Sequence, residues 1–94
     1  MGYFLERIPM HYFAIATFDL ATAKEVVARR RQYNYPEGFK NVQSYLDVRG
    51  TRAVIHFETD TAESIMRYTA DWPEVVFDIF PVVPSEKAWE ASLP

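Results

Sequence analysis

The two residues in this sequence best suited to acid–base catalysis are His56 and Asp78. Each lies in a short run rich in β-branched and aromatic residues, RAVIHFE and VFDIF, so both are expected on strands. Histidine has the unperturbed pKa closest to neutrality, and a neighbouring carboxylate would orient it and favour its charged form. Such a pair can act as a general acid or base. A histidine on a half-buried strand is more often a structural or interface residue, and Asp78 more often forms an ion pair or meets solvent.

Other signals for catalysis or ligand binding are weaker. The consecutive arginines 29–31 can hold an anionic ligand, although a solvated basic helix end is the simpler interpretation. His11 and His56 have no sequence-local partners for a metal, and the chain has no cysteine. The sequence also has no glycine-rich phosphate loop and no serine in a nucleophile elbow. We therefore expect no metal and no cofactor.

Length and composition place the chain among small globular domains. It has 94 residues, of which 49% are hydrophobic and 24% charged, and its formal net charge is -3. An acidic balance argues against binding to nucleic acid or to an anionic membrane surface. No apolar run approaches the roughly 20 residues that a membrane helix requires.

The first nine residues are interpreted separately from the rest. Glu6 and Arg7 interrupt the only apolar stretch there, so it does not match a secretory signal. We interpret residues 1–9 as an N-terminal extension, with Met10 as an alternative natural start and residues 10–94 as a single domain. An extra edge strand or a terminal arm that clasps a partner is the alternative. The expected location is the cytoplasm.

Apolar periodicity predicts four strands and two helices in the order β-α-β-β-α-β. The first helix is expected to begin after an N-cap at Asp19, or one turn later at Thr22. The second is expected to begin after Asp60 and to stop before Pro73. The predicted strands are Met10–Thr17, Phe39–Val48, Arg52–Glu58 and Val75–Val83.

Chain connectivity restricts how these strands can be arranged. Right-handed crossovers in both β-α-β halves predict a four-stranded antiparallel sheet in the order 4-1-3-2, with two helices on one face. This is the α+β class and, within it, the ferredoxin-like sandwich. The arrangement predicts a fold class, which assigns no function by itself.

Strand alternation assigns each side chain to one face of the sheet. The face under the helices is expected to be apolar, with these residues: Phe13, Ile15, Val42, Leu46, Val48, Ala53, Ile55, Phe57, Val75, Phe77 and Ile79. The opposite face is expected to be mixed, with these residues: Tyr12, Ala14, Ala16, Gln43, Tyr45, Asp47, Val54, His56, Glu58, Val76, Asp78 and Phe80.

The mixed face predicts a partner and a site. It is too apolar for a sheet facing water, so we expect two copies to pair across it as a dimeric α/β barrel. Ala14 and Ala16 would leave a hollow between His56 on one neighbouring strand and Asp78 on the other. The predicted ligand-binding residues are Tyr12, Tyr45, His56, Asp78 and Phe80, with His56 and Asp78 also as catalytic candidates.

A family resemblance rests on short motifs spread over residues 10–83. They are Tyr35-Pro36-Glu37-Gly38, Ser44-Tyr45, Glu58-Thr59-Asp60, Trp72, Phe77 and Pro81-Val82. With these motifs the chain resembles the small proteins grouped as domain-of-unknown-function family 3303, although Tyr45 stands where tryptophan is expected. The resemblance implies the ferredoxin-like, dimeric α/β-barrel architecture and carries no activity or functional residues.

Three functions are compatible with these observations. The first is a homodimeric module that binds a small, partly aromatic molecule in a cavity between sheet and helices. The second is a structural or assembly module without a ligand. The third is a cofactor-poor enzyme for proton transfer or monooxygenase-like chemistry, with His56 as acid or base. We favour the binding module and expect the partners to be a second copy and a small molecule, with no nucleic acid and no membrane.

Overall fold

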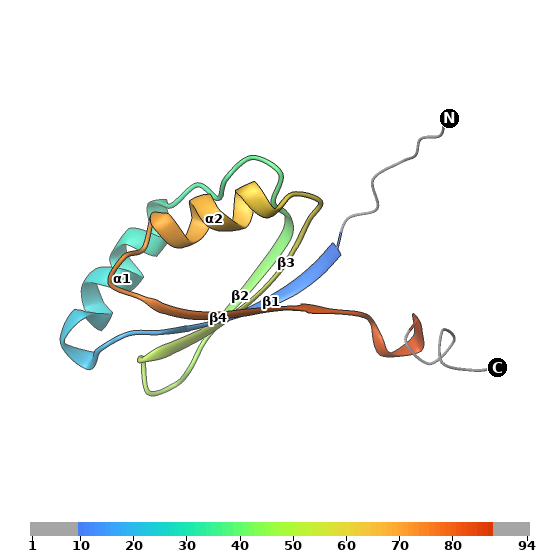
Figure 1. Cartoon of the computed structure of the whole chain (residues 1–94). Helices are drawn as coiled ribbons and strands as arrows, with labels where there is room; N and C mark the ends of the chain where they lie inside the picture. Colours follow the sequence, from blue (N-terminus) through green and yellow to red (C-terminus); the bar gives the residue numbers. More distant parts are fainter. Residues whose placement is uncertain (1–9, 88–94) are drawn as a thin grey trace, which may run out of the picture.

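The computed structural model describes residues 10–87 and has the predicted order of elements. The elements are β1 (Met10–Thr17), α1 (Leu20–Gln32), β2 (Lys40–Leu46), β3 (Arg52–Thr59), α2 (Ala62–Ala70) and β4 (Val76–Val82). Both helices lie on the same side of the sheet (Figure 1). Residues 85–87 begin a further helical turn. The N-terminal extension 1–9 lies outside the described residues, and the domain boundary at Met10 stays a prediction.

The four strands form one antiparallel sheet in the order β2-β3-β1-β4. This is the predicted order read from the opposite edge, so the α+β class and the strand order are confirmed. The central strands are β3 and β1. Every pair of neighbours is antiparallel, because each β-α-β crossover passes over one strand before the chain returns to the sheet.

The N-cap of the second helix lies one residue later than predicted. Its N-cap is Thr61, whose side-chain oxygen accepts a hydrogen bond from the Ser64 amide at 3.2 Å, whereas Asp60 is an exposed residue before it. Thr61 therefore takes the capping position that the sequence assigned to Asp60. The first helix has its N-cap at Asp19, as predicted, although no side-chain hydrogen bond supports it there.

Strand β2 is shorter than predicted and carries a bulge. The register shifts between Lys40 and Gln43, and Asn41 between them has a φ of 53°. At the other end the chain turns at Asp47, so Val48 is fully exposed rather than part of the core. The prediction for Val48 is therefore wrong, because residues 47–50 form the hairpin turn that joins β2 to β3.

The predicted alternation of β1 is also wrong. Ala14 and Ala16 are buried under the helices, and the Tyr12 ring stacks on Phe57 in the same layer. Phe13 and Ile15 instead lie on the open face, where they are opposite His56 and Val54 respectively. Both faces of β1 are apolar in sequence, so composition alone favoured the larger residues for the core. Ala14 is completely buried in the core beneath the helices, and Ala16 lines a cavity described below.

Those rings form the centre of the hydrophobic core. Phe57 is completely buried and stacks on Phe39 with ring centroids 4.3 Å apart. Tyr68 of α2 contacts both rings, and Tyr35 of the α1–β2 loop stacks on Phe39. Aromatic pairs in such offset and edge-to-face geometries add to the free energy gained by burying their area. This cluster holds the helices and the loop above the sheet.

Candidate functional site

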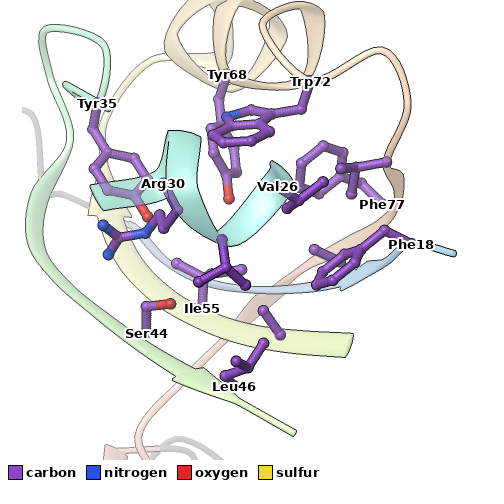
Figure 2. A pocket seen from close by; sticks show the side chains of 14 residues that line it. Phe18, Val26, Arg30, Tyr35, Ser44, Leu46, Ile55, Tyr68, Trp72 and Phe77 are labelled. Carbon is purple, nitrogen blue, oxygen red and sulfur yellow. The ribbon is translucent and has the colours of Figure 1, made fainter. Parts of the chain in front are cut away.

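A cavity of about 130 Å³ lies between the helices and the sheet. Figure 2 shows its walls, which come from both helices, from the α1–β2 loop and from all four strands or their ends. Most of the lining is apolar. The lining residues are Ala16, Phe18, Val26, Val27, Arg30, Tyr35, Ser44, Leu46, Ala53, Ile55, Tyr68, Trp72, Val75 and Phe77.

The cavity exists because small residues form its floor and one edge strand is left uncovered. Ala16 of β1 and Ala53 of β3 are register partners, so two short side chains lie next to each other beneath α1. Ser44 and Leu46 of β2 also face the cavity, but both are exposed. The cavity therefore opens to solvent along β2.

Three polar atoms of cavity-lining residues are buried without a partner. Arg30 Nε, the Tyr35 hydroxyl and Trp72 Nε1 form no hydrogen bond in the described structure. The guanidinium lies over the Tyr35 ring, 5.1 Å from its centroid. Burial raises the pKa of Tyr35, and the nearby Arg30 charge acts in the opposite direction. Each of these groups can donate a hydrogen bond, and a buried polar group without a hydrogen bond is costly.

The Tyr68 hydroxyl points into the middle of the same cavity (Figure 2). Burial raises the pKa of Tyr68 above its ordinary value, and the neighbouring Tyr35 and Tyr33 add to the effect. The hydroxyl therefore stays protonated at neutral pH. It can donate a hydrogen bond to a molecule in the cavity or accept one from it.

The arginines at the end of α1 have three different environments. Arg29 forms an ion pair with Glu74, donates to the Asp71 carbonyl at 3.0 Å and lies over the Trp72 ring. Arg30 lines the cavity, and Arg31 is exposed and does not line it. Sequence reasoning could not separate the three arginines, because the directions of their side chains depend on where α2 packs.

The open face of the sheet carries most of the residues predicted as a site, but not as one cluster. Tyr45, His56, Asp78 and Phe80 face this side, whereas Tyr12 lies on the helix-covered side. His56 is opposite Phe13 of β1, and Asp78 is opposite Ile15. The predicted hollow over alanine is therefore filled by large side chains, which also separate His56 from Asp78.

His56 has a different polar partner from the one the sequence suggested. Its Nε2 lies 3.1 Å from Nδ1 of His11, and the two rings stack with centroids 5.3 Å apart. Both rings line a shallow, open depression together with Gln43 and Tyr45. Within residues 10–87 no group of three or more histidine, cysteine, aspartate or glutamate side chains is placed to hold a metal.

Sequence reasoning missed the polar residues of the cavity. Tyr35 appeared only as part of a family motif, and Arg30 only as one of three arginines. The signal that could have found them is the pair of small residues, Ala16 and Ala53, on adjacent central strands. That signal requires the strand register, which one sequence does not supply.

Together these observations define a small α+β domain with a cavity between its sheet and helices. A family model described as "Domain of unknown function (DUF3303)" matches residues 10–94, and the chain belongs to this family. Searches of curated proteins and of solved structures gave no significant match. Among the described residues, no helix has both the length and the apolar character needed to cross a membrane.

Proposed function

We propose that this protein binds a small, largely apolar molecule in the cavity between sheet and helices. The observation that carries the proposal is the pairing of an apolar chamber with three buried groups that have no hydrogen-bond partner: Arg30 Nε, the Tyr35 hydroxyl and Trp72 Nε1. Leaving a buried polar group unpaired costs about 1–3 kcal/mol. A ligand that supplies an acceptor would remove this cost while burying its apolar surface.

The size of the cavity limits the ligand. An engineered cavity of roughly 150 Å³ lined by aliphatic and aromatic side chains binds benzene in another protein. The cavity here measures about 130 Å³ and is lined by similar side chains. A single six-membered ring is thus the largest body that fits inside, with any substituent directed toward the opening at β2.

Binding accounts for the lining better than catalysis does. The polar side chains at the cavity are those of Arg30, Tyr35, Ser44, Tyr68 and Trp72, and none of them is a carboxylate or an imidazole. His56, the residue that the enzyme hypothesis needs, lies on the opposite face of the sheet. We therefore place the function in recognition of a ligand.

A substitution that fills the cavity tests the proposal. Ala53→Leu adds volume inside the cavity, while Val54→Leu enlarges the next residue on the open face. With benzyl alcohol as a neutral, ring-sized probe, we expect the thermal unfolding midpoint to rise with ligand in the wild type and in Val54→Leu. Ala53→Leu should be stabilised by about 0.5–2 kcal/mol without ligand and should lose the response. An undiminished response in Ala53→Leu would refute cavity binding.

We also propose a ferredoxin-like layout and a homodimer formed through the open face of the sheet. The order of elements and the position of both helices on one side support the layout. Tyr45 and Val76 on the open face are 65% and 73% exposed, and Phe80 is 38% exposed. The same face carries acidic and basic groups, so it can complement itself across a two-fold axis. A second copy is the occupant that this composition favours.

A further inference from the structure

We propose that the ligand is a monocyclic aromatic acid, with its ring in the apolar cavity and its carboxylate at Arg30 and Tyr35. This inference rests on the proposed function and adds the chemical class of the ligand. It follows from the position of a single positive charge at the cavity, from what surrounds that charge and from the shape of the apolar walls.

The Arg30 charge has no acidic partner within residues 10–87. The ion pairs found there join Arg29 to Glu74, and both Arg49 and Arg52 to Asp47. No carboxylate lines the cavity. A half-buried guanidinium without a counter-ion favours an anion, because a charge-assisted hydrogen bond is roughly twice as strong as a neutral one.

Two of the three unpaired donors, Arg30 and Tyr35, lie at one end of the cavity. In Figure 2 Arg30, Tyr35 and Ser44 lie at the same end, while Phe18 and Phe77 lie at the other. Ser44 is exposed on the edge strand, so this end is where solvent enters. A carboxylate there keeps one side hydrated while it accepts from Arg30 and from the Tyr35 hydroxyl.

The far end suits an aromatic ring. Phe18, Trp72 and Phe77 form its walls, and Ala16 and Ala53 leave room for a flat group beneath α1. Ring-to-ring contacts in offset or edge geometry would add to the area buried. The Tyr68 hydroxyl reaches the middle of the cavity, where it can meet a polar substituent on the ring.

Calorimetric titrations with benzoate, benzamide and acetate measure separately how the negative charge and the ring of the ligand contribute to its affinity. Benzamide keeps the ring without the negative charge, and acetate keeps the carboxylate without the ring. We expect benzoate to bind the wild-type protein about tenfold or more tightly than benzamide, and acetate to give no measurable binding. Arg30→Gln should lower benzoate affinity about tenfold or more and benzamide affinity by a smaller factor, because only benzoate loses a charge-assisted hydrogen bond. Arg31→Gln removes the same charge from the adjacent, exposed position and should change neither.

Each other outcome has a definite meaning. Equal affinities for benzoate and benzamide would overturn the acid class while leaving a neutral cavity ligand in place. Acetate binding as strongly as benzoate would overturn the assignment of the ring to the cavity. If neither ring compound binds, both this inference and the proposed function fail. Retained benzamide binding by Arg30→Gln also shows that this variant is folded.

Discussion

The Asp47 carboxylate organises the turn between β2 and β3. One oxygen accepts the Arg49 backbone N–H at 2.8 Å, and the other accepts from Arg49 and Arg52, each at 3.2 Å. These contacts lower the pKa of Asp47 from its ordinary value of 3.8 to about 2, and the hydrogen bond from the Arg49 backbone N–H has the largest effect. Because the folded-state pKa is depressed, the stabilisation is complete above about pH 4 and is lost as the pH falls toward 2.

Asp47→Asn should therefore change the acid stability of the protein. We expect a slightly lower unfolding midpoint at neutral pH and a shallower loss of stability between pH 4 and 2, measured by circular dichroism at a series of pH values. Asp60→Asn is the control, since no hydrogen bond or ion pair of Asp60 is found within residues 10–87. An acid profile of Asp47→Asn that matches the wild type would contradict this account of the turn.

For single residues, the sequence predicted which residues lie on the open face better than it predicted their contact partners. It placed His56 and Asp78 on one face of the sheet, because alternation within β3 and β4 is regular. It could not pair them, since the side chains between them come from β1 and depend on its register. The contact of His56 with His11 could not be predicted for the same reason, because His11 also lies on β1.

At the scale of elements, the α1–β2 loop packs closely on the start of α2. Gly38 has a φ of +102°, and a Cβ added there would lie 2.8 Å from Ser64 Oγ. Ser64 Oγ in turn donates to the Glu37 carbonyl at 2.7 Å. The loop carries Tyr35, so this contact helps to position one of the three unpaired donors of the cavity.

Gly38→Ala should destabilise the protein more than Gly50→Ala. Gly50 has a φ of +79° with open space around it, so alanine there costs only backbone strain. We expect roughly 2–3 kcal/mol for Gly38→Ala against about 1 kcal/mol for Gly50→Ala in urea unfolding. Equal costs at the two positions would show that the loop does not approach Ser64 as closely as described.

The elements themselves were largely predictable. The strand runs, the end of the second helix before Pro73 and the order of the sheet followed from apolar spacing, turn residues and the handedness of crossovers. Strand β1 was not, because MHYFAIAT is apolar on both faces and nothing local says which one the helices cover. That single error moved the expected hollow from the helix side of Ala14 and Ala16 to the open side.

At the scale of the whole molecule, the two faces of the sheet have separate proposed roles. The helix side holds the cavity, and the open side pairs with a second copy. Tyr45→Glu places a charge on the open face, and Met66→Glu places one on α2 at a similarly exposed position, 70% against 65%.

We expect sedimentation equilibrium to give twice the chain mass for the wild type and for Met66→Glu. Tyr45→Glu should shift the population toward single chains, by about 10²-fold or more in the dissociation constant, because a charge would be buried against an apolar partner surface. A wild-type protein that sediments as single chains at micromolar concentration would overturn the dimer, although not the cavity.

Two isoleucines can report on which side of the sheet the ligand binds, which is the central proposal. Ile55 lines the cavity and Ile15 lies on the open face, so their methyl groups report the two sides of the same sheet. In a methyl NMR titration with benzoate, we expect saturable shifts at Ile55 and at the cavity residue Val26, with no shift at Ile15. Saturable shifts at Ile15 with Ile55 unmoved would contradict it.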